Sequence, residues 1–364
     1  MNTSDYIFPL IALLVSAIFT MVVMPWLLKF CKKRGFYDKP DERKVHTNNI
    51  PRLGGSLFVP AIFVGISTSL FIMGNFSSDT PLIKVSTLVI ITGIFIIYLI
   101  GLLDDVMGLP ARFKFIVQFV AALFLPCCGL YINNMYGLFG IYDVPIYIGY
   151  PLAIFLNLLI VNSINLIDGI DGLASGLSVI ALVIFIILFG RLGVVSYTIF
   201  AAALIGTVLV FMYFNLFGNM SRGTKTFMGD TGSLILGYAL AYLTLKYAMH
   251  NPHVLPYRPH ALLIACTLLI VPIFDLTRVA FARLLNRKSI FHPDKTHIHH
   301  LCMRAGFSMR GTLVLILLLQ IAFCVINFIL IKYTVSATFI LFVDILLFAT
   351  FIYYISRKRK SISQ

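Results

Sequence analysis

Apolar segments long enough to cross a bilayer fill most of this 364-residue chain and constrain its fold more than any other feature. A helix needs about 20 apolar residues to span the hydrocarbon core, and about eleven such runs can be traced. They cover residues 6–30, 55–74, 83–103, 113–132, 147–167, 173–190, 194–217, 232–250, 260–284, 311–332 and 335–356. Hydrophobic residues make up 60% of the chain and the mean hydropathy is +0.97, which excludes an ordinary soluble protein. The sequence predicts an all-α polytopic membrane protein, with residues 1–364 forming one integral-membrane domain.

The placement of positive charge predicts the orientation. The net charge is +14, which in a soluble protein would favour a nucleic-acid partner. If the N-terminus is outside and the runs alternate, however, all but five of the 28 lysines and arginines lie on one face. The exceptions are Lys84, Arg191, Lys246, Arg258 and Lys332. Because positive residues concentrate on the cytoplasmic side, we expect a periplasmic N-terminus, a cytoplasmic C-terminus and no nucleic-acid partner.

The acidic residues gather in the predicted cytoplasmic loops. These loops cover residues 31–54, 104–114, 165–172, 218–231 and 285–310, and they hold nine of the fourteen acids. Carboxylates are unfavourable near lipid, so their concentration at one face favours a shared polar site. The plainer alternative is that loops are simply where charge is tolerated.

The first acidic motif is the Asp104-Asp105 pair, which follows an apolar run. Adjacent carboxylates are unfavourable unless a metal ion or cationic side chains neutralise them. Arg112 and Lys114, at the start of the next run, are suitable partners. A hydrated turn is the alternative interpretation.

The second motif places Asn162, Asn165, Asp168 and Asp171 at every third position. These residues would share one side of a helix if the helix continues that far. Two glycines within the motif would let the backbone approach a ligand closely. Amide and carboxylate oxygens suit Mg²⁺, uracil or sugar hydroxyls, although Asp-Gly alone is also a turn signal.

The third motif, Gly-Asp230-Thr-Gly-Ser, follows Lys225 and begins the next predicted helix. A helix N-terminus offers free N–H groups and a positive dipole end, which favour phosphate. Asp230 could instead be an N-cap, and that role would leave its second oxygen available to a metal.

The fourth motif contains Asp294, His297, His299, His300 and Arg304. A His-x-His-His cluster can bind zinc, but no further cysteine or histidine loop completes a closed site. A cationic, hydrogen-bonding pocket for pyrophosphate is the favoured interpretation, with imidazoles that titrate near neutral pH.

Together these motifs resemble the polyprenyl-phosphate N-acetylhexosamine-1-phosphate transferases. The resemblance rests on six segments in order: Asp38–His46, Pro51–Gly55, Leu103–Asp105, Asn165–Leu173, Phe227–Ser233 and His297–His300. The His-Ile-His-His form is similar to the branch that transfers N-acetylglucosamine-1-phosphate (GlcNAc-1-phosphate), whereas another branch has three consecutive histidines.

The resemblance implies an eleven-helix enzyme of the bacterial inner membrane that transfers GlcNAc-1-phosphate from UDP-GlcNAc to undecaprenyl phosphate at the cytoplasmic face. It implies that Asp230 binds Mg²⁺, for which Mn²⁺ can substitute, with Asn165 beside it. It also implies that Asp104, Asp105, Asp168 and Asp171 are catalytic. The substrate-binding residues that it implies are Lys44, His46, Arg112, Lys114, Asn162, Asn215, Lys225, Asp294, His297, His299, His300 and Arg304.

Several alternatives stay open from the sequence. The donor could carry another UDP-N-acetylhexosamine, such as UDP-GalNAc or UDP-FucNAc, and a homodimer is compatible with the chain. A phosphate monoester is largely dianionic at pH 7, which favours Asp104 as an orienting group over a base. A transporter or flippase is the main rival class, and Asp344, in the middle of the last run, fits it. A structural assembly factor is the other rival class. The acids lie at the rim and no internal repeat is evident, so an enzyme is favoured.

Overall fold

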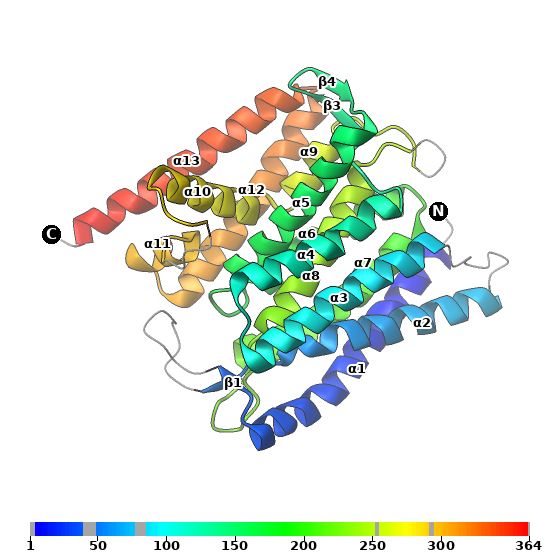
Figure 1. Cartoon of the computed structure of the whole chain (residues 1–364), viewed down its shortest axis with the longest axis vertical. Helices are drawn as coiled ribbons and strands as arrows, with labels where there is room; N and C mark the ends of the chain where they lie inside the picture. The colour runs from blue at the N-terminus through cyan, green and yellow to red at the C-terminus, as the bar shows by residue number, and fades with distance from the viewer. Residues whose placement is uncertain (1–3, 39–48, 77–84, 252–254, 291–294, 363–364) are drawn as a thin grey trace.

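The computed structural model describes residues 4–38, 49–76, 85–251, 255–290 and 295–362 (Figure 1). The helices are α1 (Ser4–Arg34), the short 3₁₀ turn η1 (Gly54–Leu57), α2 (Phe58–Phe76), α3 (Val85–Met107), α4 (Ala111–Cys127), α5 (Ile146–Ile167), α6 (Leu173–Arg191), α7 (Val195–Phe217), α8 (Gly229–Ala248), α9 (Ala261–Thr267), α10 (Ile270–Leu285), α11 (Ile298–Arg304), α12 (Met309–Lys332) and α13 (Ala337–Ile362). The strands form two short antiparallel pairs, β1 (Tyr37–Asp38) with β2 (Ile50–Pro51) and β3 (Asn134–Leu138) with β4 (Ile141–Asp143).

The helices confirm the prediction of an all-α polytopic membrane protein. Within the described ranges, eight helices are long and apolar enough to cross a membrane, or up to nine if the bent pair α9–α10 is one span. The predicted runs at 113–132 and 232–250 form α4 and α8, which fall outside that set. Helix α4 has only 17 residues, and α8 carries a charged residue in its first and last turns.

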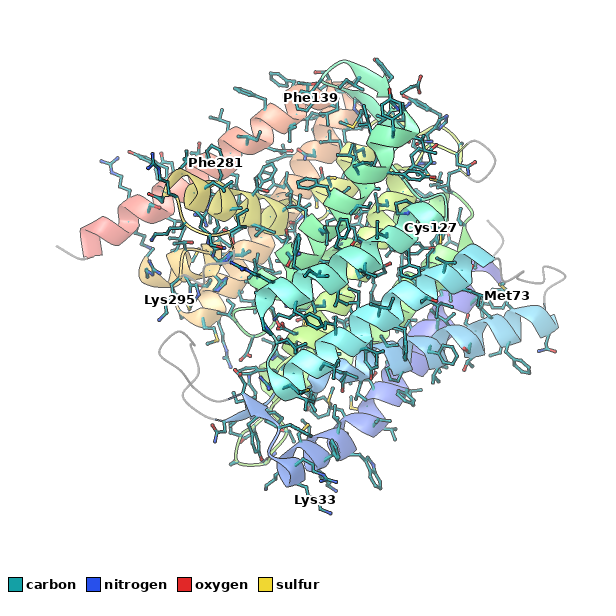
Figure 2. All side chains as sticks on the ribbon, viewed as in Figure 1. Lys33, Met73, Cys127, Phe139, Phe281 and Lys295 are labelled. Carbon is teal, nitrogen blue, oxygen red and sulfur yellow. The ribbon has the colours of Figure 1, made fainter. Side chains whose placement is uncertain are left out.

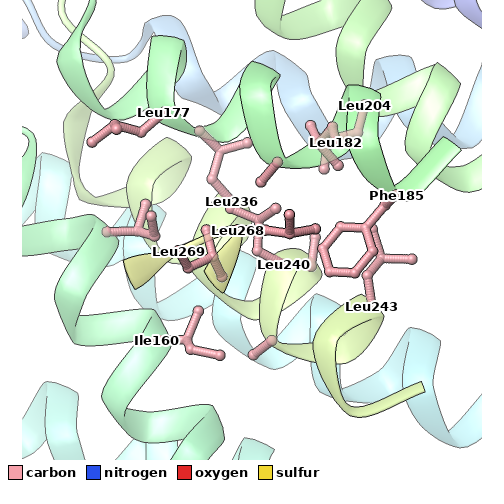
Figure 3. Packing of buried hydrophobic residues seen from close by; sticks show 14 of the residues in the cluster. Ile160, Leu177, Leu182, Phe185, Leu204, Leu236, Leu240, Leu243, Leu268 and Leu269 are labelled. Carbon is pink, nitrogen blue, oxygen red and sulfur yellow. The ribbon is translucent and has the colours of Figure 1, made fainter. Parts of the chain in front are cut away.

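Helix α8 is the centre of the bundle. It packs mainly against α3 and α5, and nearly all of its residues are buried. Figure 3 shows Leu236 and Leu240 of α8 among Ile160 of α5, Leu177 of α6 and Leu268 beyond α9. A helix that is apolar on all sides belongs in the interior of a bundle. The first turn of α8 is therefore held in the middle of one end of the bundle.

Labelled residues mark the two ends of the bundle. Figure 2 shows Lys33 and Lys295 towards one end and Phe139 and Cys127 towards the other, and Figure 1 places the two chain termini on opposite sides. The β3–β4 hairpin lies in the loop between α4 and α5. Pro145, two residues after the hairpin ends at Asp143, is the N-cap of α5.

One predicted helix boundary was wrong, and one predicted run is bent. Helix α3 continues through Asp104 and Asp105 to Met107, so the acidic pair lies in its last turn and not in a loop. The run at 260–284 is not one straight helix, because α9 and α10 are bent by 81° around Leu268 and Leu269.

Candidate active site

A polar cavity of about 450 Å³ lies where the ends of α3 and α5 meet the start of α8. Its polar lining residues are Asp38, Arg52, Asp104, Asp105, Asn165, Asp168, Asp171, Asn215, Asp230, Ser233 and His300. Three segments far apart in the sequence supply most of these side chains. We call Asp104, Asp105, Asp168, Asp171 and Asp230 the carboxylate wall.

Asp105 fixes the start of α8. It is 3% exposed, and its carboxylate accepts hydrogen bonds from the backbone N–H of Asp230 and of Thr231, both at 2.9 Å. The Thr231 hydroxyl donates a third bond at 2.5 Å. The expectation that this helix N-terminus offers free N–H groups to phosphate is therefore wrong at these two positions. Asp105 is a capping group that holds Asp230 in place.

Lys114 neutralises the other two carboxylates nearby. Its ammonium donates to Asp104 Oδ2 at 3.0 Å and also to Asp230 Oδ2. The second oxygen of Asp104 accepts the backbone N–H of Leu109 at 2.6 Å. Lys114 thus pairs with Asp104 as expected from the sequence. Arg112 is exposed at the start of α4 and does not line the cavity.

Two glycines allow η1 to pack directly against the backbone at the start of α8. Gly54 and Gly55 donate hydrogen bonds to the carbonyls of Phe227 and Met228 at 3.1 and 2.9 Å, so η1 lies directly on the start of α8. A β-carbon on Gly55 would overlap the backbone of Gly232. Only glycine permits this approach, which carries the neighbouring Arg52 into the cavity lining.

The Asn–Asp motif does not follow one helical face. Helix α5 ends at Ile167, and Asp168 is its C-cap, because the chain turns at the following glycines. Asn165 donates to Ser233 Oγ of α8 at 2.8 Å. Asn162 instead donates to Gln118 Oε1 of α4 at 2.8 Å, and it does not line the cavity.

Among the described residues, Asp171 has hydrogen-bond partners and Asp168 has none. Lys225 donates to Asp171 Oδ2 at 2.5 Å, and Asn215 donates to Asp171 Oδ1 at 3.1 Å. Asp168 makes no hydrogen bond within the described part of the chain. Burial, together with the neighbouring carboxylates of Asp230, Asp171 and Asp105, raises the pKa of Asp168 to about 8. An unpaired acid among other acids is a position that a cation would stabilise.

The histidines lie on a separate unit that consists of α10 and residues 295–304, which we call the histidine arm. The carboxylate of Asp275 in α10 is 1% exposed, accepts the backbone N–H of Ile298 at 3.0 Å and lies 2.8 Å from His297 Nδ1. Arg278 donates to the same carboxylate at 2.6 Å and to the carbonyl of Thr296. Asp275 therefore ties the histidine loop to α10.

Two of the histidines are neutral at pH 7. Burial first, then His300 and His297, lower the pKa of His299 to about 3. Burial, followed by His297, Arg304 and Lys295, lowers the pKa of His300 to about 4. Of the histidines that the structure describes, only His300 lines the cavity. His299 packs against Gly169, where a β-carbon would overlap its imidazole. The sequence predicted a cationic pocket, but the imidazoles of His299 and His300 are neutral.

Several residues were missed or cannot be placed. Arg52, Asp275 and Arg278 were not predicted as site residues, although Arg52 lies within the Pro-Arg-Leu-Gly-Gly motif that carries the family resemblance. Arg304 is exposed and donates to the carbonyl of Lys295. The predicted substrate residues Lys44, His46 and Asp294 lie outside the described residues.

The donor set of the cavity fits Mg²⁺ better than zinc. In the part of the chain that the structure describes, no three His, Cys, Asp or Glu side chains converge as metal ligands. Mg²⁺ needs only one or two carboxylates, because substrate phosphates and water complete its shell. Asp230, the unpaired Asp168 and Asn165 line the same cavity and offer oxygen donors.

The fold and the site define a multi-pass membrane protein with a carboxylate-rich polar cavity at one end of its bundle. The family model of glycosyl transferase family 4 matches residues 87–248, which contain the whole carboxylate wall. A probable undecaprenyl-phosphate N-acetylglucosaminyl 1-phosphate transferase of Bacillus subtilis is 33% identical over 92% of this chain and 89% of its own length. The undecaprenyl-phosphate alpha-N-acetylglucosaminyl 1-phosphate transferase of Escherichia coli K12 is 30% identical over 83% of this chain and 78% of its own length. This chain belongs to the family of undecaprenyl-phosphate N-acetylglucosaminyl 1-phosphate transferases.

Proposed function

We propose that the protein transfers GlcNAc-1-phosphate from UDP-GlcNAc to undecaprenyl phosphate and releases UMP. The observation that carries this proposal is the carboxylate wall, with Lys114, Lys225 and Arg52, around one cavity at the end of a membrane bundle. The names of the relatives supply the acceptor lipid and the sugar. A transporter would instead need its ionisable groups near the middle of the bilayer.

In the reaction, an oxygen of the lipid phosphate forms a bond to the sugar-bearing phosphorus, and the bond from that phosphorus to UMP breaks. One phosphoanhydride replaces another, so the reaction is readily reversible. Two anions have to meet, and the main requirement is therefore charge neutralisation and alignment. Arg52 suits this task, because it lines the cavity and its buried Nε has no hydrogen-bond partner among the described residues.

The contacts of Asp104 support an orienting role. One of its oxygens accepts from Leu109 N–H and the other from Lys114, so the carboxylate already fixes the chain after α3 and the Lys114 ammonium. Lys114 in turn holds Asp230. The lipid phosphate is largely dianionic at pH 7 and needs no base there. His300 would donate an N–H to the donor pyrophosphate within the same cavity.

We further propose that the enzyme depends on Mg²⁺, with Mn²⁺ as a substitute. Asp230, Asp168 and Asn165 are the residues that would hold it. When bound, the ion would neutralise charge on the phosphate oxygens. Its presence would also favour the ionised form of Asp168, whose neighbours oppose ionisation in its absence.

The proposed location is the bacterial inner membrane, with the cavity facing the cytoplasm. Counting α4, α8 and the bent pair α9–α10 as crossings, together with the other eight, gives the eleven that the sequence predicts. An odd number of crossings puts the two termini on opposite faces, as the basic loops require. A cysteine-labelling map of intact cells would contradict this orientation if residues near the cavity reacted with an impermeant reagent.

The direct test uses purified protein in detergent with UDP-GlcNAc, polyprenyl phosphate and Mg²⁺. UMP should form only when all three are present, which separates a transferase from a flippase and from an assembly factor. Competition among UDP-GlcNAc, UDP-GalNAc and UDP-MurNAc-pentapeptide assigns the sugar. Turnover without lipid phosphate, or preference for another donor, would overturn the corresponding part of the proposal.

A further inference from the structure

A second polar cluster lies inside the helix bundle, apart from the cavity residues. It consists of Thr267 at the end of α9, Gln320 and Asn327 of α12 and Asp344 of α13, each no more than 2% exposed. Polar side chains in membrane-spanning helices are unfavourable unless they find partners, and an acid there has a function by default. The proposed reaction uses none of these residues.

Gln320 bridges the break between α9 and α10. Its Nε2 donates to the carbonyl of Thr267 at 2.8 Å, and its Oε1 accepts the backbone N–H of Val271 at 3.2 Å. These two backbone groups lie on either side of the 81° bend. A break in a membrane helix leaves backbone groups without intrahelical partners, and neighbouring helices have to satisfy them. Gln320 does this for both sides at once.

Asn327 connects the break to Asp344. Its Nδ2 donates to Thr267 Oγ1 and to Asp344 Oδ2, both at 2.9 Å. The remaining oxygens of the pair, Asn327 Oδ1 and Asp344 Oδ1, are buried and have no hydrogen-bond partner among the described residues. Both atoms are acceptors if Asp344 is ionised. A proton on Asp344 Oδ1 turns that atom into a donor, for which the orphaned amide oxygen of its partner is the available acceptor.

The surroundings of Asp344 also favour its neutral form. From α12, the titratable neighbour is the thiol of Cys324, which contacts Gln320. The charged or titratable residues on the elements packed against α13 are Tyr136 of β3, His299, His300, Cys302 and Arg304 of α11, and Arg310 and Lys332 at the two ends of α12. Helix α10, which meets α13 at Phe274 and Phe348, carries Asp275, Arg278 and Arg283. None of them forms an ion pair with Asp344 within the described ranges. A buried carboxylate without a cation is strongly unfavourable.

We propose that Asp344 is a neutral carboxylic acid paired with Asn327, and that this pair and Gln320 hold the α9–α10 break at the angle that positions His297. Val271 and Asp275 are one turn apart in α10, and Asp275 binds the start of the histidine loop at His297 and Ile298. A change in the bend would therefore move the arm relative to the carboxylate wall on α3, α5 and α8. The effect on catalysis rests on the proposed function, whereas the protonation state and the bend do not.

Infrared difference spectroscopy tests the protonation state. The spectrum of the wild type minus that of Asp344→Asn at pH 7 should contain the carbonyl band of one protonated carboxylic acid. The asparagine can donate its Nδ2 to Asn327 Oδ1, so this variant should keep the wild-type melting temperature. A difference spectrum without that band overturns the neutral acid. The melting temperature can also be compared in Na⁺ and in choline salts. If Na⁺ raises it in the wild type but not in Asp344→Asn, the oxygens Asn327 Oδ1 and Asp344 Oδ1 bind a cation and the neutral acid is overturned.

Thiol labelling tests the positioning role without requiring activity. Cys302 lies on α11 and is fully buried, so its labelling, mapped by peptide mass spectrometry, reports displacement of the histidine arm. Asp344→Leu removes the hydrogen bond from Asn327 and should raise Cys302 labelling severalfold, while Asp344→Asn should match the wild type. The control Thr207→Val removes the contact with Thr20 in the α1–α7 interface and should leave Cys302 labelling unchanged. Equal labelling in all four proteins overturns the proposed coupling.

Kinetics then connect the break to the reaction. For Asp344→Leu we expect a severalfold increase in KM for UDP-GlcNAc and a smaller change in KM for the lipid acceptor, with restoration in Asp344→Asn. A uniform fall in kcat with both KM values unchanged would mean that the cluster only stabilises the fold, and it would contradict the positioning role. If the protein does not use UDP-GlcNAc at all, the infrared and labelling results still decide the structural part.

Discussion

The carboxylate wall and the histidine arm differ in how their polar groups are supported. The wall is built on the ends of α3, α5 and α8, and lysines contact three of its five acids. The arm carries imidazoles that are neutral at two of three positions, and Asp275 ties its histidine loop to α10. The wall thus contributes excess negative charge from packed helix ends, and the arm contributes the neutral imidazole of His300 on a loop tied to α10. This division suits a reaction in which a metal ion is needed at the wall and hydrogen-bond donors at the arm.

The largest effect is expected at the wall. Asp230→Asn should lower turnover by about 10²–10³-fold, as when one electrostatic contact is removed from a preorganised site. The variant should remain folded in detergent, because Asp105 binds the backbone at this position and not the side chain. Turnover of the wild type after EDTA treatment should return with Mg²⁺ and need no zinc. Substantial turnover by the folded variant at ordinary Mg²⁺ concentrations would remove Asp230 from the metal site.

At the arm, Asp275→Asn should lower kcat/KM for UDP-GlcNAc by about 10–100-fold, the range for loss of an outer hydrogen-bond partner of a functional histidine. The carboxylate accepts from three groups, and an amide would present a donor to one of them. As a matched control, Lys295→Ala changes a residue of the arm that does not line the cavity. We expect a much smaller effect there. If kcat/KM falls equally in both variants, the loss does not depend on the Asp275 contacts, and the positioning role of Asp275 is contradicted.

The difference between wall and arm also decides what the sequence could predict. Asp104, Asp168 and Asp230 were predicted to meet because each follows or precedes a membrane run on one face. Asp105 as a helix cap could not be predicted, since its partners are backbone groups about 125 residues away, at the start of a helix.

The arm was harder to predict. Asp275 sits in an apolar run, and its meeting with His297 depends on the bend that Gln320 of α12 supports. Arg52 was missed as a site residue because only the stacking of η1 on α8 brings it to the cavity. The apolar runs and the motifs therefore predicted the helices and the face on which the polar residues gather. The contacts that depend on a helix break or on backbone partners could be seen only in the structure.

Asp104 tests whether the wall contains a base. Asp104→Asn should lower the rate by about tenfold, because the contact to Lys114 loses its charge-assisted part. The shape of the pH–rate curve above pH 7 should not change, since the lipid phosphate is already dianionic there. The measurement compares both curves at saturating lipid and Mg²⁺. Loss of an acid-limb ionisation, leaving a nearly flat residual rate, would instead make Asp104 the obligatory base.

The smallest effect is a pH-dependent change in stability that comes from the arm alone. Burial, followed by His300 and His297, lowers the pKa of His299 to about 3 in the folded protein, whereas an unfolded histidine titrates near 6.5. Between these values the unfolded state binds more protons, so the free energy of unfolding falls as pH falls below about 6.5. From pH 7 to pH 5.5 the expected loss is about 1 kcal/mol for this residue, or about 1–2 °C in melting temperature for a chain of this length.

His299→Gln removes this titration, so its melting temperature should fall less than that of the wild type over the same pH interval. Thr207→Val, which alters the α1–α7 interface, should lower the melting temperature by the same amount at both pH values. If His299→Gln keeps the wild-type pH dependence, the imidazole is not held neutral by burial. The arm would then carry charge at His299, and the contrast between a charged wall and a neutral arm would not hold at that residue.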